Sequence, residues 1–192
     1  MPVRPSPDTG RDPVHAFRPT GGTVMGTAGL SAAVVVAIAA LVTDQSTTGL
    51  RVALGAGVVG VLIWMVLLRP RVTAYADTLV LHNMASDTYL PLAGIESAAV
   101  RLTLHVWVDG RRYTCPGIGR STRSMMRSQR RGAGTTGDED YASFVESTIE
   151  DLARSAQRDL RGDLPPVRRE WAVRELGALA VLVLASGASF VL

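Results

Sequence analysis

The chain has 192 residues, a formal net charge of +3 and one cysteine, Cys115. It contains no lysine, so all 20 of its basic Lys and Arg positions are arginines. The length suits one or two domains, and a single cysteine excludes an intramolecular disulfide and any metal site built from several cysteines. Only 19% of the residues are charged, and the apolar residues are gathered into long runs. These runs decide the class of protein.

Residues 1–22 are rich in Pro, Gly, Thr and Arg and show no hydrophobic periodicity. This composition predicts a disordered tail. This stretch does not resemble a secretory signal peptide, because the polar stretch before the first apolar run is too long and contains Asp8 and Asp12.

Two uncharged apolar runs follow, Val24 to Val42 and Val52 to Leu68, joined by the short polar stretch "TDQSTTG". The first run spans roughly 28 Å as a helix at ~1.5 Å per residue, close to the ~30 Å hydrocarbon core of a bilayer. We therefore predict a transmembrane helical hairpin over residues 23–69. The alternative is a soluble core hairpin, but uncharged runs of this length are hard to bury in so small a domain.

The second run contains "GAGVVG", which matches the dinucleotide fingerprint G-x-G-x-x-G, but no strand precedes it and no βαβ unit surrounds it. Its small residues favour helix packing instead. Ala53 and Gly57, like Ala56 and Gly60, are four residues apart on one helix face, where they let a second helix approach closely.

Residues 71–116 read as about five short strands, most of them antiparallel neighbours, from "RVTAY" and "LVLHN" onward. His82 and His105 both fall on predicted strands. We interpret each as a surface or hydrogen-bonded histidine, because no cluster of Asp, Glu and His near them would make a metal site.

The clearest strand signal is "VRLTLHVWVDGRRYTC", residues 100–115, in which every second residue from Val100 to Val108 is apolar. Asp109-Gly110 supplies a two-residue type I′ turn, because both residues tolerate a positive φ. This turn places Cys115 on the apolar face. We therefore expect a small buried residue there, with a reactive thiol as the alternative.

From Arg111 to Arg131 the chain carries seven arginines and no acidic residue. The stretch has no strand pattern beyond the hairpin, so residues 117–137 are expected to form a mobile basic loop. Each arginine near an anionic leaflet contributes on the order of 1 kcal/mol of attraction. The candidate lipid-binding residues are Arg111, Arg112, Arg120, Arg123, Arg127, Arg130 and Arg131.

Apolar residues then recur at helical spacing from Tyr141 to Leu160 and predict an amphipathic helix, ended by Gly162 and Pro165-Pro166. Residues 170–192 end in an uncharged run that begins at Leu176. We expect a third transmembrane helix there. The alternatives are a helix lying on the membrane or one packed on the sheet domain.

Arginines flank the central region on both sides, whereas the connection between the first two apolar runs has little positive charge. The positive-inside rule places residues 70–163 and the N-terminus in the cytoplasm, and the C-terminus outside. The predicted location is a multi-pass position in the plasma membrane.

The stretch "RPRVTAYADTLVLHNMASDTYLPLAGIESAAVRLTLHVWVDGRRYTCPGIGR" resembles the bacterial PH-like domain family of small actinobacterial membrane proteins. The shared features are the arginines directly after the second predicted membrane segment, the hairpin "YADTLVLHN", the strand leading into "LAGIES", and the long strand ending in "DGRRY". The abundance of Ala, Val, Gly and Arg is typical of a GC-rich bacterial genome. The resemblance covers about residues 50–120 and implies a bent antiparallel sheet closed by a C-terminal helix.

The expected fold is therefore membrane α plus soluble α+β. The expected function is a non-catalytic, membrane-anchored interaction or scaffolding module that binds a protein partner or itself, with no cofactor, metal or nucleic acid. The alternatives are an anionic-lipid-associating protein that uses the arginines and, more remotely, an enzyme. No nucleophile–base, phosphate-loop or zinc-protease motif is present. No ionisable residue interrupts the apolar runs, which argues against a transporter.

Overall fold

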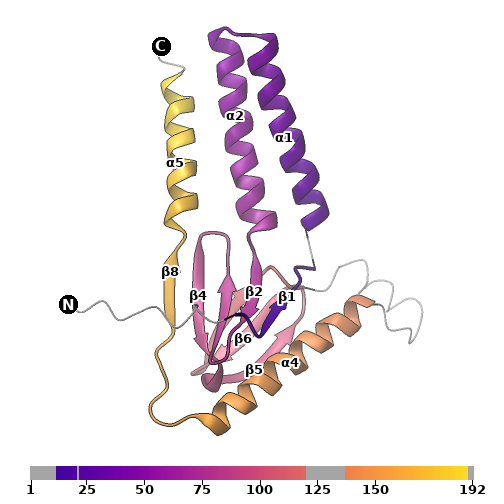
Figure 1. Cartoon of the computed structure of the whole chain (residues 1–192), viewed down its shortest axis with the longest axis vertical. Coiled ribbons are helices and arrows are strands. Elements are labelled where there is room, and N and C mark those ends of the chain that lie inside the picture. Colours follow the sequence, from indigo (N-terminus) through magenta and orange to yellow (C-terminus); the bar gives the residue numbers. More distant parts are fainter. Residues whose placement is uncertain (1–11, 21, 120–136, 190–192) are drawn as a thin grey trace, which may run out of the picture. The chain divides into compact units, whose positions relative to one another are not determined.

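The computed structural model describes residues 12–20, 22–119 and 137–189. The chain forms two compact units (Figure 1). The sheet unit comprises residues 1–21 and 70–170, and the helical unit comprises residues 22–69 and 171–192. Each unit is therefore assembled from two separate stretches of sequence.

The helical unit contains α1 (Thr23–Thr43), α2 (Thr47–Ile63) and α5 (Val173–Ala188). One turn of π-helix, η1 (Trp64–Leu68), continues α2. By length and composition, α1 and the combined α2–η1 helix can each cross a bilayer, as the two apolar runs predict. The third predicted span remains a prediction, because α5 measures only ~24 Å at ~1.5 Å per residue.

The connection between α1 and α2 is tight. Asp44 accepts a hydrogen bond from the Ser46 amide at 2.9 Å, and the Ser46 hydroxyl caps α2 by accepting from the Thr48 amide at 3.1 Å. Gly49 fits here because a Cβ at this position would overlap the carbonyl oxygen of Asp44.

The sheet unit contains two sheets. The five-stranded sheet has the order β1-β2-β3-β4-β8, and the three-stranded sheet has the order β5-β6-β7. The pairs β1–β2, β2–β3, β3–β4, β5–β6 and β6–β7 are all antiparallel. The strands are β1 (His15–Phe17), β2 (Arg71–Ala74), β3 (Thr78–His82), β4 (Ser86–Pro91), β5 (Ile95–Val100), β6 (Leu104–Val108), β7 (Arg111–Cys115) and β8 (Arg168–Trp171).

The predicted hairpin is confirmed around its turn. Asp109 and Gly110 have φ values of 49° and 66°, as a type I′ turn requires, and Leu104 lies opposite Cys115. Its first strand is shorter than predicted, because residues 101–103 separate β5 from β6. Leu102 is consequently 62% exposed instead of buried on the apolar face.

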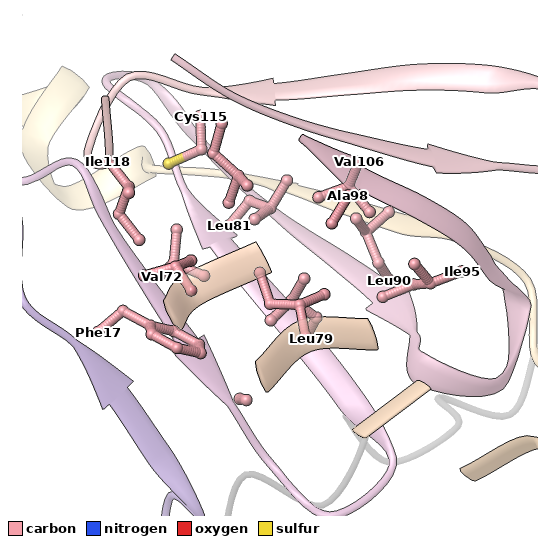
Figure 2. Close-up of a cluster of buried hydrophobic side chains, with 14 of the residues drawn as sticks. Phe17, Val72, Leu79, Leu81, Leu90, Ile95, Ala98, Val106, Cys115 and Ile118 are labelled. Atoms are coloured by element: carbon pink, nitrogen blue, oxygen red, sulfur yellow. The ribbon is translucent and has the colours of Figure 1, made fainter. Parts of the chain in front are cut away.

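The N-terminal segment also differs from the prediction of a disordered tail over residues 1–22. Residues 15–17 form β1, and the Phe17 side chain is buried in the core (Figure 2). Thr20 and Gly119 exchange two 2.8 Å hydrogen bonds, and the Tyr141 hydroxyl donates to the Arg18 carbonyl. Strand pairing with β2, one buried aromatic ring and a few polar contacts hold this segment, and hydrophobic periodicity could not reveal so short a strand.

The helix α4 (Gly137–Asp159) lies along β5 in Figure 1. Glu146 accepts a hydrogen bond from the Val100 amide, and the Gln157 side chain donates to the Ile95 carbonyl at 3.1 Å. The two helix side chains are ~16 Å apart along the axis at ~1.5 Å per residue, which matches the ~16 Å between their strand partners at ~3.3 Å per residue. The helix therefore covers the outer edge of β5 and bonds two of its outward backbone groups.

The core of the sheet unit lies between the two sheets and α4. Leu79, Leu81 and Leu90 from the five-stranded sheet meet Val106 and Ile95 from the three-stranded sheet (Figure 2). The amphipathic helix contributes mainly its small and branched residues, Ala142, Val145, Ile149 and Ala153. Phe144, which the spacing placed on the apolar face, is exposed instead.

Candidate interaction site

The predicted lipid-binding arginines fall in two parts of the chain. Arg111 and Arg112 are on β7, and both side chains are exposed. Among the described residues, neither of them forms an ion pair. The other five, Arg120, Arg123, Arg127, Arg130 and Arg131, lie outside the described residues, as does most of the predicted basic loop.

An open groove of about 780 Å³ borders β7 in the sheet unit. It is lined by Asp109 and residues 111–114, by Asn83 and Thr88, and by residues 166, 167 and 169 at the start of β8. We call it the basic groove, because three arginines, Arg111, Arg112 and Arg169, line it beside one carboxylate, Asp109.

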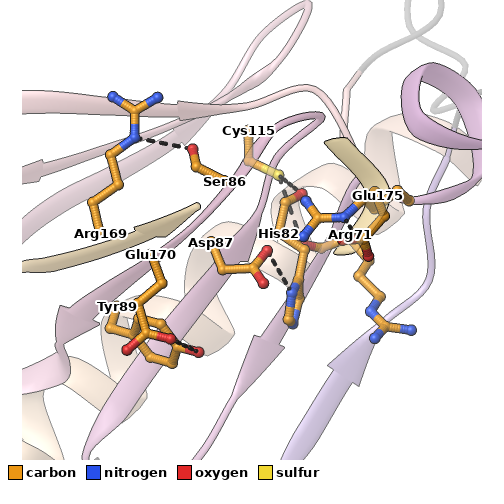
Figure 3. A network of polar contacts seen from close by, with 10 residues as sticks. Arg71, His82, Ser86, Asp87, Tyr89, Cys115, Arg169, Glu170 and Glu175 are labelled. Atoms are coloured by element: carbon orange, nitrogen blue, oxygen red, sulfur yellow. Dashed lines mark hydrogen bonds and ion pairs between the residues drawn. The ribbon is translucent and has the colours of Figure 1, made fainter. Parts of the chain in front are cut away.

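Arg169 was not among the predicted site residues. It lies on β8, which pairs next to β4, although 76 residues or more separate these strands in the sequence. Its Nε donates a 3.0 Å hydrogen bond to the hydroxyl of buried Ser86 (Figure 3). Only this long-range pairing brings Arg169 near β7, so no local pattern could have identified it.

Polar pairs organise the five-stranded sheet next to the groove. His82 and Asp87 face one another across the β3–β4 hairpin, with 3.0 Å between Nδ1 and Oδ1 (Figure 3). The Tyr89 hydroxyl donates to Glu170 at 3.4 Å. Burial, and then the negative charge of Glu170, raises the pKa of Tyr89. These contacts give polar side chains on the sheet their hydrogen-bond partners, so we assign these side chains a structural role.

The two strand histidines form no metal site with other residues of the described chain, in which no group of three or more His, Cys, Asp or Glu could hold a metal ion. His105 is bonded through Nε2 to the Thr103 hydroxyl at 3.3 Å. Burial, followed by the nearby charges of Arg112 and Arg101, lowers its pKa. The imidazole is therefore neutral at physiological pH.

Cys115 is fully buried, as the hairpin register predicts. Its thiol lies 3.7 Å from the Arg71 carbonyl and 3.6 Å from the His82 carbonyl (Figure 3). Burial raises its pKa from 9.0 to about 11, so the thiol stays protonated and unreactive at neutral pH. The alternative of a reactive thiol is not supported.

In the helical unit, the predicted packing residues lie on α2. A Cβ on Gly60 would contact Leu30 and Ala33 of α1, and one on Gly57 would contact Leu182 of α5 at 3.6 Å. Ala56, Gly57 and Gly60 line an apolar groove of about 380 Å³ together with residues of α1 and α5. Ala53, one turn earlier, is half-buried.

No family model, no curated protein and no solved structure matches this chain.

Proposed function

We propose that this protein is a membrane-anchored interaction module. The observation that carries the proposal is the apolar surface of the helical unit: along α1 and α2, large side chains such as Val35 (65% exposed) and Val59 (50% exposed) face outward. A soluble protein rarely exposes so large an apolar patch, whereas hydrocarbon is the natural solvent for it. The proposed membrane anchor comprises α1, α2–η1 and, as a third span, α5.

A PH-like architecture is the proposed fold of the sheet unit. Two features support it: the antiparallel strands form two sheets, and an amphipathic helix follows the last strand of the second sheet. The strands β1 and β8, which extend the first sheet at its two edges, are additions to that proposed plan. Such a domain is a scaffold for binding surfaces, so the fold alone assigns no ligand.

The proposed activity is binding and not catalysis. In the described residues, Cys115 is protonated and buried, His82 is bonded to Asp87, and His105 is held by a threonine. None of these side chains forms a nucleophile–base pair with a second one, which is the arrangement that covalent catalysis requires.

The proposed orientation follows the positive-inside rule, with the sheet unit in the cytoplasm and the α1–α2 connection outside. Buried Cys115 makes this easy to test in intact cells. An impermeant maleimide should label a cysteine introduced at Ser46, and should label one introduced at the exposed Ser143 of α4 only after the cells are lysed. The reverse pattern would place the sheet unit outside.

The function itself is tested by crosslinking a tagged chain in native membranes and identifying what copurifies by mass spectrometry. A reproducible complex with another protein, or a crosslinked oligomer, is the expected result. Recovery of the monomer alone, at crosslinker concentrations that trap a known complex in the same membranes, would contradict the proposal.

Association with anionic lipid is a second candidate function, because Arg111 and Arg112 are exposed and form no ion pair with described residues. Replacing all seven arginines by Gln should remove the enrichment of anionic lipid around the protein purified in native-lipid particles. Unchanged lipid composition would exclude this function. Retention of the protein complex in the same variant would separate the two functions.

A further inference from the structure

We infer that the basic groove binds an extended acidic segment of a partner protein, which adds as a strand to the free edge of β7. This inference rests on the proposed function and names the binding surface and the chemistry of the partner. Its evidence is the hydrogen-bonding pattern of β7, the contrast with β5, and the charge of the groove.

The hydrogen-bonding pattern of β7 follows from its turn. In a two-residue hairpin, the residues that flank the turn exchange both backbone hydrogen bonds, and every second pair along the strands does the same. Val108 pairs with Arg111 and Val106 with Tyr113 in this way. The N–H and C=O groups of Arg112 and Thr114 therefore point away from β6.

The outer edge of β7 has no strand neighbour in the described part of the chain. Both Arg112 and Thr114 line the basic groove, so the groove borders the strand at the two residues whose backbone groups point away from β6. The other edge of the same sheet differs, since Glu146 and Gln157 of α4 already bond the outward groups of β5. Within this three-stranded sheet, β7 is the edge that can accept a further strand.

The charge of the groove decides what kind of strand fits. Successive side chains on a strand point to opposite faces, so Arg111 and Arg112 flank the free edge on its two sides. Arg169 of β8 also lines the groove, and its Nε donates a hydrogen bond to the Ser86 hydroxyl. Arg111 and Arg112, which form no ion pair with described residues, outnumber the one carboxylate that lines the groove, Asp109, and this balance favours an acidic strand.

The same charges disfavour pairing between two copies of β7. In such a pair, arginines of one copy would lie beside arginines of the other, and like charges on neighbouring strands are destabilising. An acidic partner reverses the sign of this interaction. The occupant is therefore a different, acidic segment in extended conformation.

The test uses the full chain in nanodiscs of uncharged lipid, so that lipid headgroups do not compete. The probe is a fluorescein-labelled octapeptide, Val-Glu-Glu-Val-Val-Glu-Glu-Val, which presents acidic side chains on both faces of a strand. Two control peptides carry Lys in place of Glu, or the acidic sequence with every amide N-methylated. We expect the acidic peptide to bind, and each control to bind at least about tenfold more weakly.

Two variants separate backbone pairing from charge. Thr114→Pro removes an outward N–H, which an edge strand tolerates, and Arg112→Glu reverses a charge. Each should weaken acidic-peptide binding about tenfold or more. The matched control is Arg101→Glu, which changes an exposed arginine at the opposite end of β6, away from the groove, and should bind as the wild type does.

Maleimide labelling of Cys115 reports whether the variants fold, since this thiol neighbours Thr114 and reacts only when the hairpin opens. If Thr114→Pro exposes the thiol, Arg112→Glu and the N-methylated peptide still decide the question. No binding of the acidic peptide, or full binding of its N-methylated form, would overturn strand addition. The second result would assign the groove to simple anion binding, as of a lipid headgroup.

The same variants distinguish this inference from the proposed function. If crosslinked complexes are recovered unchanged from membranes containing correctly folded Thr114→Pro and Arg112→Glu proteins, the interaction module stands and the groove assignment fails. If peptide binding behaves as expected but native membranes yield no complex, the groove assignment stands and the proposed function fails.

Discussion

The two units of this molecule use apolar side chains in opposite ways. In the sheet unit, Leu81 and its neighbours are buried between two sheets and a helix. In the helical unit, residues such as Val59 stay half-exposed on helices long enough to cross a bilayer. The sheet unit buries its apolar side chains in its own core, whereas in the proposed membrane anchor the apolar side chains of the helical unit contact lipid. Substitutions of the same chemical type should therefore have different effects in the two units.

The largest expected effect is that of Leu81→Ala. This fully buried side chain lies in the middle of β3, so the substitution should lower the free energy of unfolding of the sheet unit by about 2–5 kcal/mol. Hydrogen exchange of the β2–β4 amides in the detergent-solubilised chain measures the loss of protection.

The matched control is Leu41→Ala in α1, where the side chain is 49% exposed. Removing a methyl-rich group that faces lipid or detergent leaves no cavity, so exchange in both units should stay close to that of the wild type. Equal effects of the two substitutions would contradict the contrast between the units.

A charge on an exposed apolar site sharpens the contrast further. Val59→Arg places a charge near the middle of the α2–η1 helix, which opposes membrane insertion by about 3 kcal/mol. Leu102→Arg alters a side chain that is even more exposed, but in the sheet unit, where surface substitutions change stability by about 0.5 kcal/mol or less. Alkaline extraction of membranes should release the first variant and retain the second. Retention of both would mean that α2 does not face lipid.

The pH dependence of the sheet unit depends in part on Cys115. The thiol has a pKa of 9.0 when exposed and about 11 when folded, so the unfolded state loses its proton first as the pH rises. Stability should therefore fall between these two values, by about 3 kcal/mol for a shift of this size. Unfolding of Cys115→Ala, measured over the same range, should lack this component. Parallel curves for the two proteins would show that the thiol is not the cause.

The sequence predicts local features of this molecule better than long-range ones. Asp109-Gly110 and the alternation beyond it correctly predict the turn, the register and the burial of Cys115. The alternation also runs through Leu102, and it therefore conceals the break between β5 and β6. A connection whose residues keep the period of the flanking strands, as Leu102 does here, leaves no sign in the hydrophobic pattern.

The missed parts of the candidate site have a different cause. Arg111 and Arg112 were identified from the run of arginines, whereas β8 is a four-residue strand rich in charge. Its position next to β4, and so the place of Arg169, depends on pairing between distant segments. Intrinsic strand preference is too weak to predict such a pairing from one sequence.

The smallest expected effect concerns the closed edge of β5. In Glu146→Ala the Val100 amide loses its acceptor, and because Glu146 is only half-buried, water replaces part of the bond; we expect a loss of about 1 kcal/mol. Glu146→Gln keeps a carbonyl oxygen at the same position and should lose less. Hydrogen exchange at Val100 measures both. If Glu146→Ala leaves that amide as protected as in the wild type, α4 covers the edge of β5 by packing alone. The difference between the covered edge of β5 and the free edge of β7 would then depend on the position of the helix and not on this hydrogen bond.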